Sequence, residues 1–256
     1  MRKACRLAWR SLWLGAEVSF VGLRFAFLFL RTLGRPALRE RAVCLHYSCR
    51  RVLRVFVDHV EVHGLRPSSG LLVCNHLSYL DILLLGSLSP PVFVSKSEVK
   101  HWPVFGWFGW LSGTVFVRRA KRGEVAEVGG QIRALLDEGH LVILFPEGTS
   151  SDGRHILPFK SSLLEPVVGQ TGGLYAGCVG YTLADGVVGD DVCYWRDMTF
   201  FPHVVKLLSK QFVHARASFS EIEQPAADRK ALARQLHGEV AGLRHGMYPS
   251  ESSRSG

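Results

Sequence analysis

The chain has 256 residues, and its 31 Lys and Arg against 22 Asp and Glu give a net charge of +9. Hydrophobic residues make up 47% of it, which is ordinary for a folded core, and the length suits one large domain with an appendage. The six cysteines form no CxxC pair. This argues against a disulfide framework and against a paired-cysteine zinc site, so we expect reduced cysteines in a reducing compartment.

The positive charge is concentrated at the N-terminus. Residues 1–57 carry 12 Lys and Arg against two Glu, whereas the rest of the chain is close to neutral. In the first helix of this segment five charged residues recur every seven positions and form one narrow stripe on a largely apolar, aromatic surface. These residues are Lys3, Arg10, Glu17, Arg24 and Arg31. The pattern predicts a helix that lies in the membrane interface, with Trp and Phe inserted and Arg facing anionic headgroups.

Pro36 suits the first turn of a second helix, which is predicted to run to about residue 56 and carries five further arginines. Residues 1–57 are therefore predicted to be an amphipathic, basic two-helix segment that docks on an anionic membrane. Two alternatives stay open: an ordinary helical hairpin packed on the globular domain, and an irregular membrane span. A non-catalytic module that binds membrane or nucleic acid through this segment is a third, and the apolar surroundings of the charges argue against nucleic acid.

From residue 58 the pattern changes to short strands that alternate with helices, which predicts an α/β domain over residues 58–248 with a sheet that is at least partly parallel. The predicted strands lie at residues 59–63, 70–75, 92–94, 113–117, 141–145, 173–183 and 211–221. The predicted helices follow Ser78 and cover parts of 102–110, 123–138, 163–168 and 226–244. The polar tail, residues 249–256, is predicted to be disordered.

Polar side chains follow several of these strands. In open α/β sheets, ligands bind beyond the carboxyl ends of the strands. The residues predicted at those ends are Asn75, His76, Lys96, Arg119 and Glu147. They supply one base, an amide, a carboxylate and two cations of the kind that hold phosphate or carboxylate groups, which predicts a binding site for an anionic ligand.

His76 and Asp81 stand at the turn between the second strand and its helix. Five residues apart on one helix, their side chains would diverge by roughly 140°. They meet only if His76 precedes the helix and Asp81 lies in its first turn, with Ser78 as the N-cap. Asp81 would then bond one ring nitrogen of His76 and leave the other free as a base. The alternative is a capping box in which Asp81 only accepts a backbone N–H.

Other motifs of known chemistry are missing from the sequence. We find no P-loop, no GxGxxG fingerprint, no GxSxG elbow and no His or Cys cluster at metal spacing. The missing elbow disfavours a serine hydrolase. The sequence predicts no metal and no cofactor.

Three motifs in order resemble the glycerolipid acyltransferase family, whose members include the 1-acyl-glycerol-3-phosphate acyltransferases. They are Asn75-His76-x4-Asp81, Gly113-Thr-Val-Phe116-Val-Arg-Arg119 and Phe145-Pro-Glu147-Gly148-Thr149. The resemblance covers roughly residues 50–220. It implies the fold of that family, a partly parallel mixed sheet flanked by helices, preceded by a two-helix membrane-docking motif. It also implies a peripheral or monotopic enzyme at the cytoplasmic face of the inner membrane.

The resemblance implies a role for each matching residue. His76 would deprotonate the acceptor hydroxyl and Asp81 would orient it, and the hydroxyl would attack an acyl thioester directly. Arg119 and Lys96 would hold the anionic headgroup. The remaining residues of the implied acceptor site are Asn75, Gly113, Phe116, Glu147, Gly148, Thr149 and Lys160. The partners implied are a lysolipid acceptor and an acyl donor, either acyl-CoA or acyl carrier protein.

Two positions depart from the family pattern. The second motif commonly reads Phe-Ile-Asp-Arg, and Arg118 stands in the place of the acid; the third commonly ends in Gly-Thr-Arg, and Ser150 replaces that Arg. The segment from Leu157 to Ser162 is closer to bacterial relatives that include ornithine-lipid acyltransferases. The resemblance implies lysophosphatidic acid as the expected acceptor, and these departures keep lyso-ornithine lipid or another anionic lysolipid open as the alternative.

Overall fold

The computed structural model describes residues 3–101, 105–117, 122–169 and 173–248. Its centre is one seven-stranded sheet with the order β1-β7-β6-β2-β5-β3-β4. The strands are β1 (His59–His63), β2 (Gly70–Cys74), β3 (Pro91–Lys96), β4 (Val115–Val117), β5 (Leu141–Leu144), β6 (Leu174–Leu183) and β7 (Val213–Glu221). Only the β6–β7 pair is antiparallel among these strands, so the predicted partly parallel mixed sheet is confirmed.

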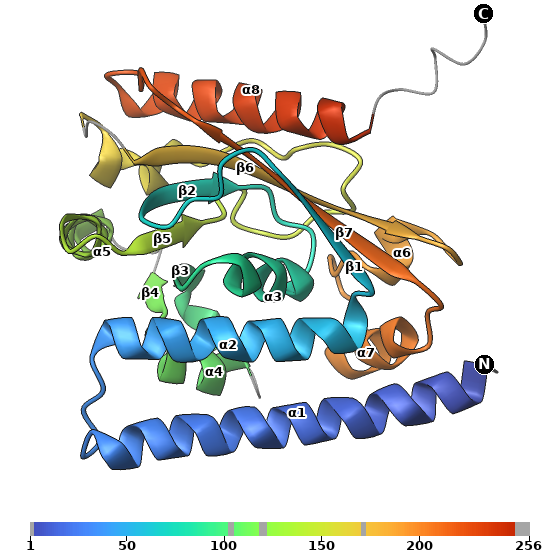
Figure 1. Cartoon of the computed structure of the whole chain (residues 1–256). Coiled ribbons are helices and arrows are strands. Elements are labelled where there is room, and N and C mark those ends of the chain that lie inside the picture. The colour runs from blue at the N-terminus through green and yellow to red at the C-terminus, as the bar shows by residue number, and fades with distance from the viewer. Residues whose placement is uncertain (1–2, 102–104, 118–121, 170–172, 249–256) are drawn as a thin grey trace, which may run out of the picture.

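Helices cover both faces of the sheet (Figure 1). They are α1 (Lys3–Arg31), α2 (Leu38–Phe56), α3 (Tyr79–Leu88), α4 (Phe105–Ser112), α5 (Arg122–Asp137), α6 (Val188–Asp191), α7 (Phe200–Leu208) and α8 (Arg229–Met247). Three short 3-10 turns lie at Ser97–His101, Ser161–Leu163 and Glu165–Val167. The last two occupy the region predicted as a helix over 163–168, and α6 and α7 were not predicted.

Two hydrophobic cores lie on opposite faces of the sheet. Side chains of β2 alternate between them, because successive residues of a strand point to opposite faces. Leu72 and Cys74 join the core beneath α2 and α3, and Leu71 and Val73 join the core beneath α5 and α8. β2 is therefore buried on both sides, and its carboxyl end leads into Asn75 and His76.

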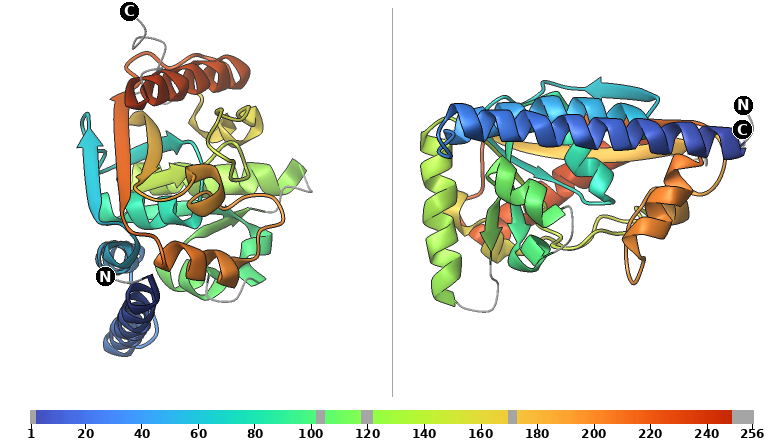
Figure 2. Two further views of the ribbon diagram at one scale, coloured as in Figure 1. Left: turned by 90° about the vertical axis from the view of Figure 1, so that its right-hand side faces the viewer. Right: turned by 90° about the horizontal axis from the view of Figure 1, so that it is seen from below.

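The first helix, α1, forms an outer layer on α2 and runs along the whole molecule (Figures 1 and 2). Two residues of its charged stripe, Arg10 and Glu17, face inward, whereas Lys3 and Arg31 are exposed and Arg24 is half-buried. Arg10 is buried and donates to Asp58 Oδ1 at 2.9 Å, and Glu17 is buried and accepts from Arg51 Nε at 2.5 Å. This middle part of the stripe faces inward because the partner of Arg10 is the residue before β1 and the partner of Glu17 belongs to α2.

The outer face of α1 is consequently apolar. Its exposed large side chains include Trp9, Leu12, Phe20, Leu23, Phe27 and Leu30. Exposed Trp107 and Trp110 of α4 and exposed Phe201 and Val205 of α7 belong to helices that lie on the same side of the sheet (Figure 1). By length and composition alone, α1 could cross a membrane.

Candidate active site

The turn between β2 and α3 brings His76 and Asp81 together. Ser78 has extended backbone angles at the N-cap, so α3 begins at Tyr79 and Asp81 falls in its first turn. His76 precedes the helix, and its Nδ1 lies 2.8 Å from Asp81 Oδ2. The predicted hydrogen bond is therefore present. With a carboxylate as its acceptor, Nδ1 carries the proton and Nε2 is left with a lone pair.

Asp81 combines the two functions that the sequence left as alternatives. Its Oδ2 also accepts from the backbone N–H groups of Leu77, at 2.6 Å, and Ser78, at 2.9 Å. Its Oδ1 accepts from the hydroxyl of Tyr181 at 2.8 Å, and the residue has no exposed surface. A carboxylate has acceptor sites only, so four donors around it form a satisfied buried group. The same side chain orders the turn and orients the ring.

The segment after β5 holds His76 from the other side. The imidazole stacks on the Phe145 ring at a centroid distance of 4.3 Å. The His76 N–H donates to Glu147 Oε1 at 2.9 Å, and the His76 carbonyl accepts from Ser151 N at 3.0 Å. Ring and backbone of His76 are thus both fixed, which is the preorganisation that a catalytic base requires.

Glu147 faces the protein interior. Its second oxygen, Oε2, accepts from Leu157 N at 3.1 Å, so the carboxylate ties the His76 peptide to the loop that follows β5. Burial raises the pKa of the Glu147 carboxyl to about 7, against the opposing effect of the two backbone donors. This carboxylate, predicted to engage the acceptor, is occupied by backbone groups and does not line the pocket described next.

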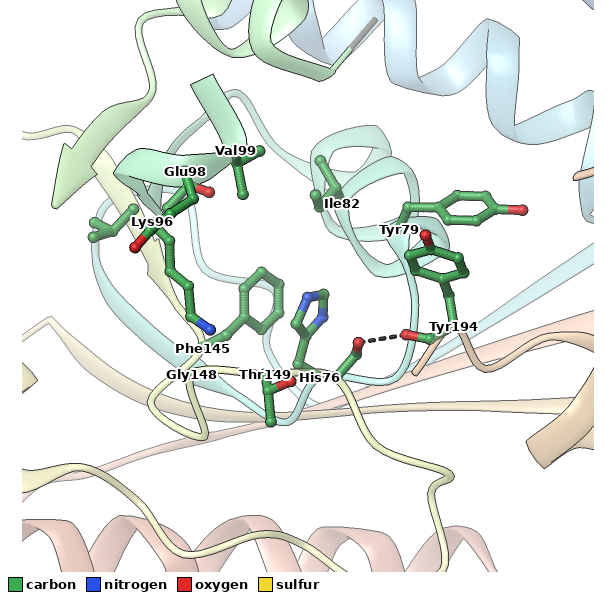
Figure 3. Close-up of a pocket in the computed structure, with 13 residues that line it drawn as sticks. His76, Tyr79, Ile82, Lys96, Glu98, Val99, Phe145, Gly148, Thr149 and Tyr194 are labelled. Carbon is green, nitrogen blue, oxygen red and sulfur yellow. Dashed lines mark hydrogen bonds between the residues drawn. The ribbon is translucent and has the colours of Figure 1, made fainter. Parts of the chain in front are cut away.

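A pocket of about 390 Å³ lies in front of the His76 ring (Figure 3). Its wall is largely apolar, and Lys96 and Glu98 are charged residues in it. The lining residues are His76, Tyr79, Ile82, Val94, Ser95, Lys96, Glu98, Val99, Phe145, Gly148, Thr149, Ser150 and Tyr194. In Figure 3 the Lys96 side chain extends toward Phe145, on whose ring His76 is stacked. The ends of β2, β3 and β5 therefore converge on one cavity, as the strand-end pattern predicted.

Other residues predicted for the site lie elsewhere. Asn75 is buried and bonds the backbone of Val179 twice, through Nδ2 to the carbonyl at 3.0 Å and through Oδ1 from the N–H at 2.7 Å. It joins β2 to β6 rather than facing the pocket. Gly113 has a φ of 84°, and a side chain there would collide with Leu38. Phe116 and Lys160 are absent from the pocket wall, and Arg119 lies outside the described residues.

Sequence reasoning missed several residues of the pocket and its support. Tyr79, Tyr194 and Glu98 line the pocket, Phe145 stacks on the imidazole, and Tyr181 bonds Asp81. Phe145 stood within a recognised motif, and its place directly before Pro146 and Glu147 was a usable signal. Tyr181 is 100 positions from Asp81, and no spacing rule connects them.

Comparison with known proteins places this arrangement in a family. The family described as Acyltransferase matches residues 59–176. A lyso-ornithine lipid O-acyltransferase of Brucella abortus is 35% identical over 187 residues, which are 68% of this chain and 70% of the relative. A second protein of that name, from Rhodobacter capsulatus, is 38% identical over 63% of this chain and 60% of the relative.

Two further proteins show similarity to this chain, one in sequence and one in fold. A 1-acyl-sn-glycerol-3-phosphate acyltransferase of Neisseria gonorrhoeae is 31% identical over 68% of this chain and 72% of the relative. The crystal structure of PlsC, the 1-acyl-sn-glycerophosphate acyltransferase of Thermotoga maritima, superposes with a TM-score of 0.66 over 97% of this chain and 99% of that one, at 17% identity. That likeness shows the fold. The chain belongs to the acyltransferase family, and the enzyme class expected from its motifs is confirmed.

Proposed function

We propose that this enzyme moves a fatty acyl chain from a soluble thioester donor to the free hydroxyl of a lysolipid, with His76 as the general base. The observation that carries the proposal is the buried Asp81 carboxylate 2.8 Å from His76 Nδ1, beside a largely apolar pocket. The names of the similar proteins, lysolipid acyltransferases of two kinds, support the same substrate class.

The chemistry follows from the free Nε2 of the ring. Nε2 takes the proton of the acceptor hydroxyl as that oxygen attacks the thioester carbonyl carbon. The tetrahedral intermediate then collapses, its C–S bond breaks, and the departing thiolate receives the proton from the imidazolium. The Asp81 carboxylate stabilises the imidazolium between these steps. General-base help of this kind contributes about 10²–10⁴-fold, and a thioester is already activated.

For the acceptor, we propose lyso-ornithine lipid in preference to lysophosphatidic acid. The ornithine headgroup carries one ammonium and one carboxylate, and the pocket offers one carboxylate, Glu98, and one ammonium, Lys96. A phosphate monoester carries up to two negative charges and no positive one. The third motif also has Ser150 where the family commonly has Arg, and the Ser150 hydroxyl donates to the Tyr194 carbonyl. Lysophosphatidic acid is the second candidate, favoured by the two arginines at positions 118 and 119.

We propose that the enzyme acts at the membrane surface. The apolar outer face of α1 would enter the interface, and the soluble donor would reach the pocket from the cytoplasmic side. No resident cofactor is proposed, because the acyl group arrives already activated on acyl-CoA or acyl carrier protein.

The test is a lysolipid panel with purified enzyme. Lyso-ornithine lipid and lysophosphatidic acid are each offered with acyl-CoA and with acyl carrier protein, and kcat/KM is measured. We expect the higher value for lyso-ornithine lipid. Glu98→Gln should lower that value at least about fivefold while changing lysophosphatidic acid acylation less than twofold. A higher value for lysophosphatidic acid would reverse the order of the two acceptors.

The base is tested with His76→Ala, and His245→Ala, an exposed histidine of α8, is the matched control. We expect His76→Ala to abolish turnover while the protein remains folded. Undiminished turnover, or a trapped acyl-serine intermediate, would refute the mechanism. An inactive wild-type enzyme that still binds vesicles would favour a non-catalytic membrane module.

A further inference from the structure

The second oxygen of Asp81 has a separate partner. Oδ2 serves the His76 ring and two backbone N–H groups, whereas Oδ1 accepts from the hydroxyl of Tyr181 at 2.8 Å. Tyr181 lies on β6, the strand next to β2, and its side chain is fully buried together with Asp81. In the part of the chain that the structure describes, no other hydrogen bond to Oδ1 occurs. We propose that Tyr181 is a positioning residue of acyl transfer, which fixes the Asp81 carboxylate and thereby sets the orientation and basicity of His76.

The geometry explains why this contact matters. Asp81 Oδ2 is shared by three donors, so rotation of the carboxylate about its Cβ–Cγ bond would break all three bonds at once. The Tyr181 hydroxyl holds Oδ1 and opposes that rotation. A hydrogen bond to a charged group is also a strong one, because the donor neutralises part of the charge. Tyr181 therefore limits how much negative charge Asp81 presents to the His76 ring.

Tyr181 is itself firmly placed. Its carbonyl accepts from the hydroxyl of Tyr248, the residue after α8, at 3.0 Å. Gly180 makes room for that contact, since a side chain there would collide with the Tyr248 hydroxyl. Burial, with the nearby Asp81 charge, holds the pKa of the Tyr181 phenol well above its ordinary value, so this group remains a donor throughout the pH range of an assay.

The first measurement compares Tyr181→Phe with the wild type in pH–rate profiles. Phenylalanine keeps the ring and removes only the hydroxyl. We expect kcat to fall about tenfold, with both KM values changed less than about twofold, because the lost contact orients the base and touches no substrate. The acid limb of the kcat profile should move to higher pH, since Asp81 without the Tyr181 hydroxyl on Oδ1 stabilises the imidazolium more strongly.

Two further measurements separate positioning from a purely structural role. The His76 ring titrated by NMR should show a higher pKa in Tyr181→Phe than in the wild type. In an Asp81→Asn background, Tyr181→Phe should change kcat less than twofold, because the carboxylate through which it acts is gone. Tyr248→Phe is the matched control: it removes a hydroxyl bonded to the Tyr181 backbone, and it should leave the acid limb where it is.

The role of Tyr181 rests on the proposed function of His76 as the base. The experiments distinguish a failure of the Tyr181 role from a failure of the His76 function. An active His76→Ala enzyme would refute the proposed function itself. An inactive His76→Ala enzyme, together with a Tyr181→Phe enzyme whose kcat and acid limb match the wild type, would refute only the role of Tyr181. If thermal unfolding shows Tyr181→Phe to be poorly folded, the double-substitution comparison and the NMR titration at low temperature decide the matter: an unmoved His76 pKa refutes the role.

Discussion

At the scale of single residues, one oxygen of the Asp81 carboxylate, Oδ2, accepts hydrogen bonds both from the backbone and from the His76 ring. It satisfies the first N–H groups of the turn before α3 and it bonds the His76 ring. An amide oxygen in the Oδ2 position could still accept from Leu77, Ser78 and the His76 ring, but the amide carries no negative charge and has no second oxygen for the Tyr181 hydroxyl. One substitution can therefore separate the hydrogen bonds that Oδ2 accepts from the negative charge that the carboxylate carries.

We predict that Asp81→Asn lowers kcat by about 10²–10⁴-fold while the acceptor KM changes less than threefold. The reason is that the amide keeps the turn and loses the charge that stabilises the imidazolium. Asp152→Asn is the control, since Asp152 accepts from Arg154 N and pairs with the Arg154 guanidinium within its own loop. Steady-state kinetics of both variants check this, and an unchanged kcat in Asp81→Asn would leave Asp81 a capping role alone.

Glu147 gives a prediction about pH and stability. Burial raises its pKa from 4.5 to about 7 in the folded state, so folding disfavours the ionised form. The associated stability is present below pH 4.5 and is lost as the pH rises through 7. Glu147→Gln removes this dependence and also leaves one of two backbone donors, His76 N or Leu157 N, without its carboxylate oxygen. The variant should be less stable than the wild type at pH 5, and the difference should shrink at pH 8.

Urea unfolding at the two pH values measures that difference. Glu127→Gln, a substitution at an exposed position of α5, is the matched control. A difference between Glu147→Gln and the wild type that stays constant from pH 5 to pH 8 would show that this carboxyl does not titrate as its burial implies.

At the scale of elements, the buried Glu17 carboxylate joins α1 to Arg51 of α2, whose side chain is 45% exposed. Glu17 accepts from Arg51 Nε at 2.5 Å, from Arg51 Nη2 at 3.0 Å and from Trp13 Nε1 at 3.1 Å. The pair Arg31–Glu40 also joins α1 to α2, and it is exposed. Glu17→Ala removes three hydrogen bonds to a buried carboxylate, including the one from Trp13 Nε1, so the free energy of unfolding should fall by about 1–3 kcal/mol. Glu40→Ala should cost less than about 1 kcal/mol.

Urea unfolding together with hydrogen exchange of α1 amides checks this contrast. The α1 amides should exchange faster in Glu17→Ala than in Glu40→Ala, because only the first removes a buried contact between the two helices. Equal effects of the two substitutions would mean that apolar packing alone attaches α1.

The sequence predicts a helix or strand well where the residue pattern that defines it is local. The apolar runs predicted β2, β3 and β5, since these strands are buried on both faces, and the periodicity over 123–138 predicted α5. In place of the helix expected over 163–168, the structure has two short 3-10 turns, and Pro166 lies in the second. The short helix α7 contains Pro202 and has no side-chain cap, so it carried no clear start signal. Strand order and the antiparallel β7 depend on long-range pairing that no local pattern encodes.

The residues of the candidate site also differ in how far the sequence could predict them. His76 and Asp81 were predictable because five residues and one turn relate them. Tyr181 reaches Asp81 from a different strand, so only the fold connects them. Asn75 and Glu147 were predicted from their chemistry as ligand-binding groups, and in the structure their polar atoms hold backbone groups of β6 and of the β2–α3 turn. Residue type alone does not tell whether a polar group next to a site faces a ligand or a peptide.

At the scale of the whole molecule, the helices α1, α4 and α7 lie on one side of the sheet and α8 on the other (Figures 1 and 2). The sequence pattern predicts that the arginines of α1 face lipid headgroups; in the structure Arg10 and Glu17 face inward, and many large apolar side chains of α1 are exposed. The attachment to a bilayer should then depend on apolar insertion more than on charge. Fully burying one Leu or Phe side chain contributes about 1.5–3 kcal/mol, so three such residues far outweigh surface charge effects at moderate salt.

We predict that Leu23→Ser, Phe27→Ser and Leu30→Ser together weaken binding to vesicles that contain anionic lipid by at least about tenfold, because even partial insertion of three such side chains exceeds one decade of affinity. Thermal stability should change little, as all three are exposed. Leu65→Ser with Val187→Ser, at exposed positions outside α1, α4 and α7, is the matched control and should bind like the wild type. Sedimentation with vesicles at low and high salt measures both. Binding that high salt abolishes in the wild type, and that the triple variant retains, would show that charge rather than the apolar face of α1 holds the enzyme at the membrane.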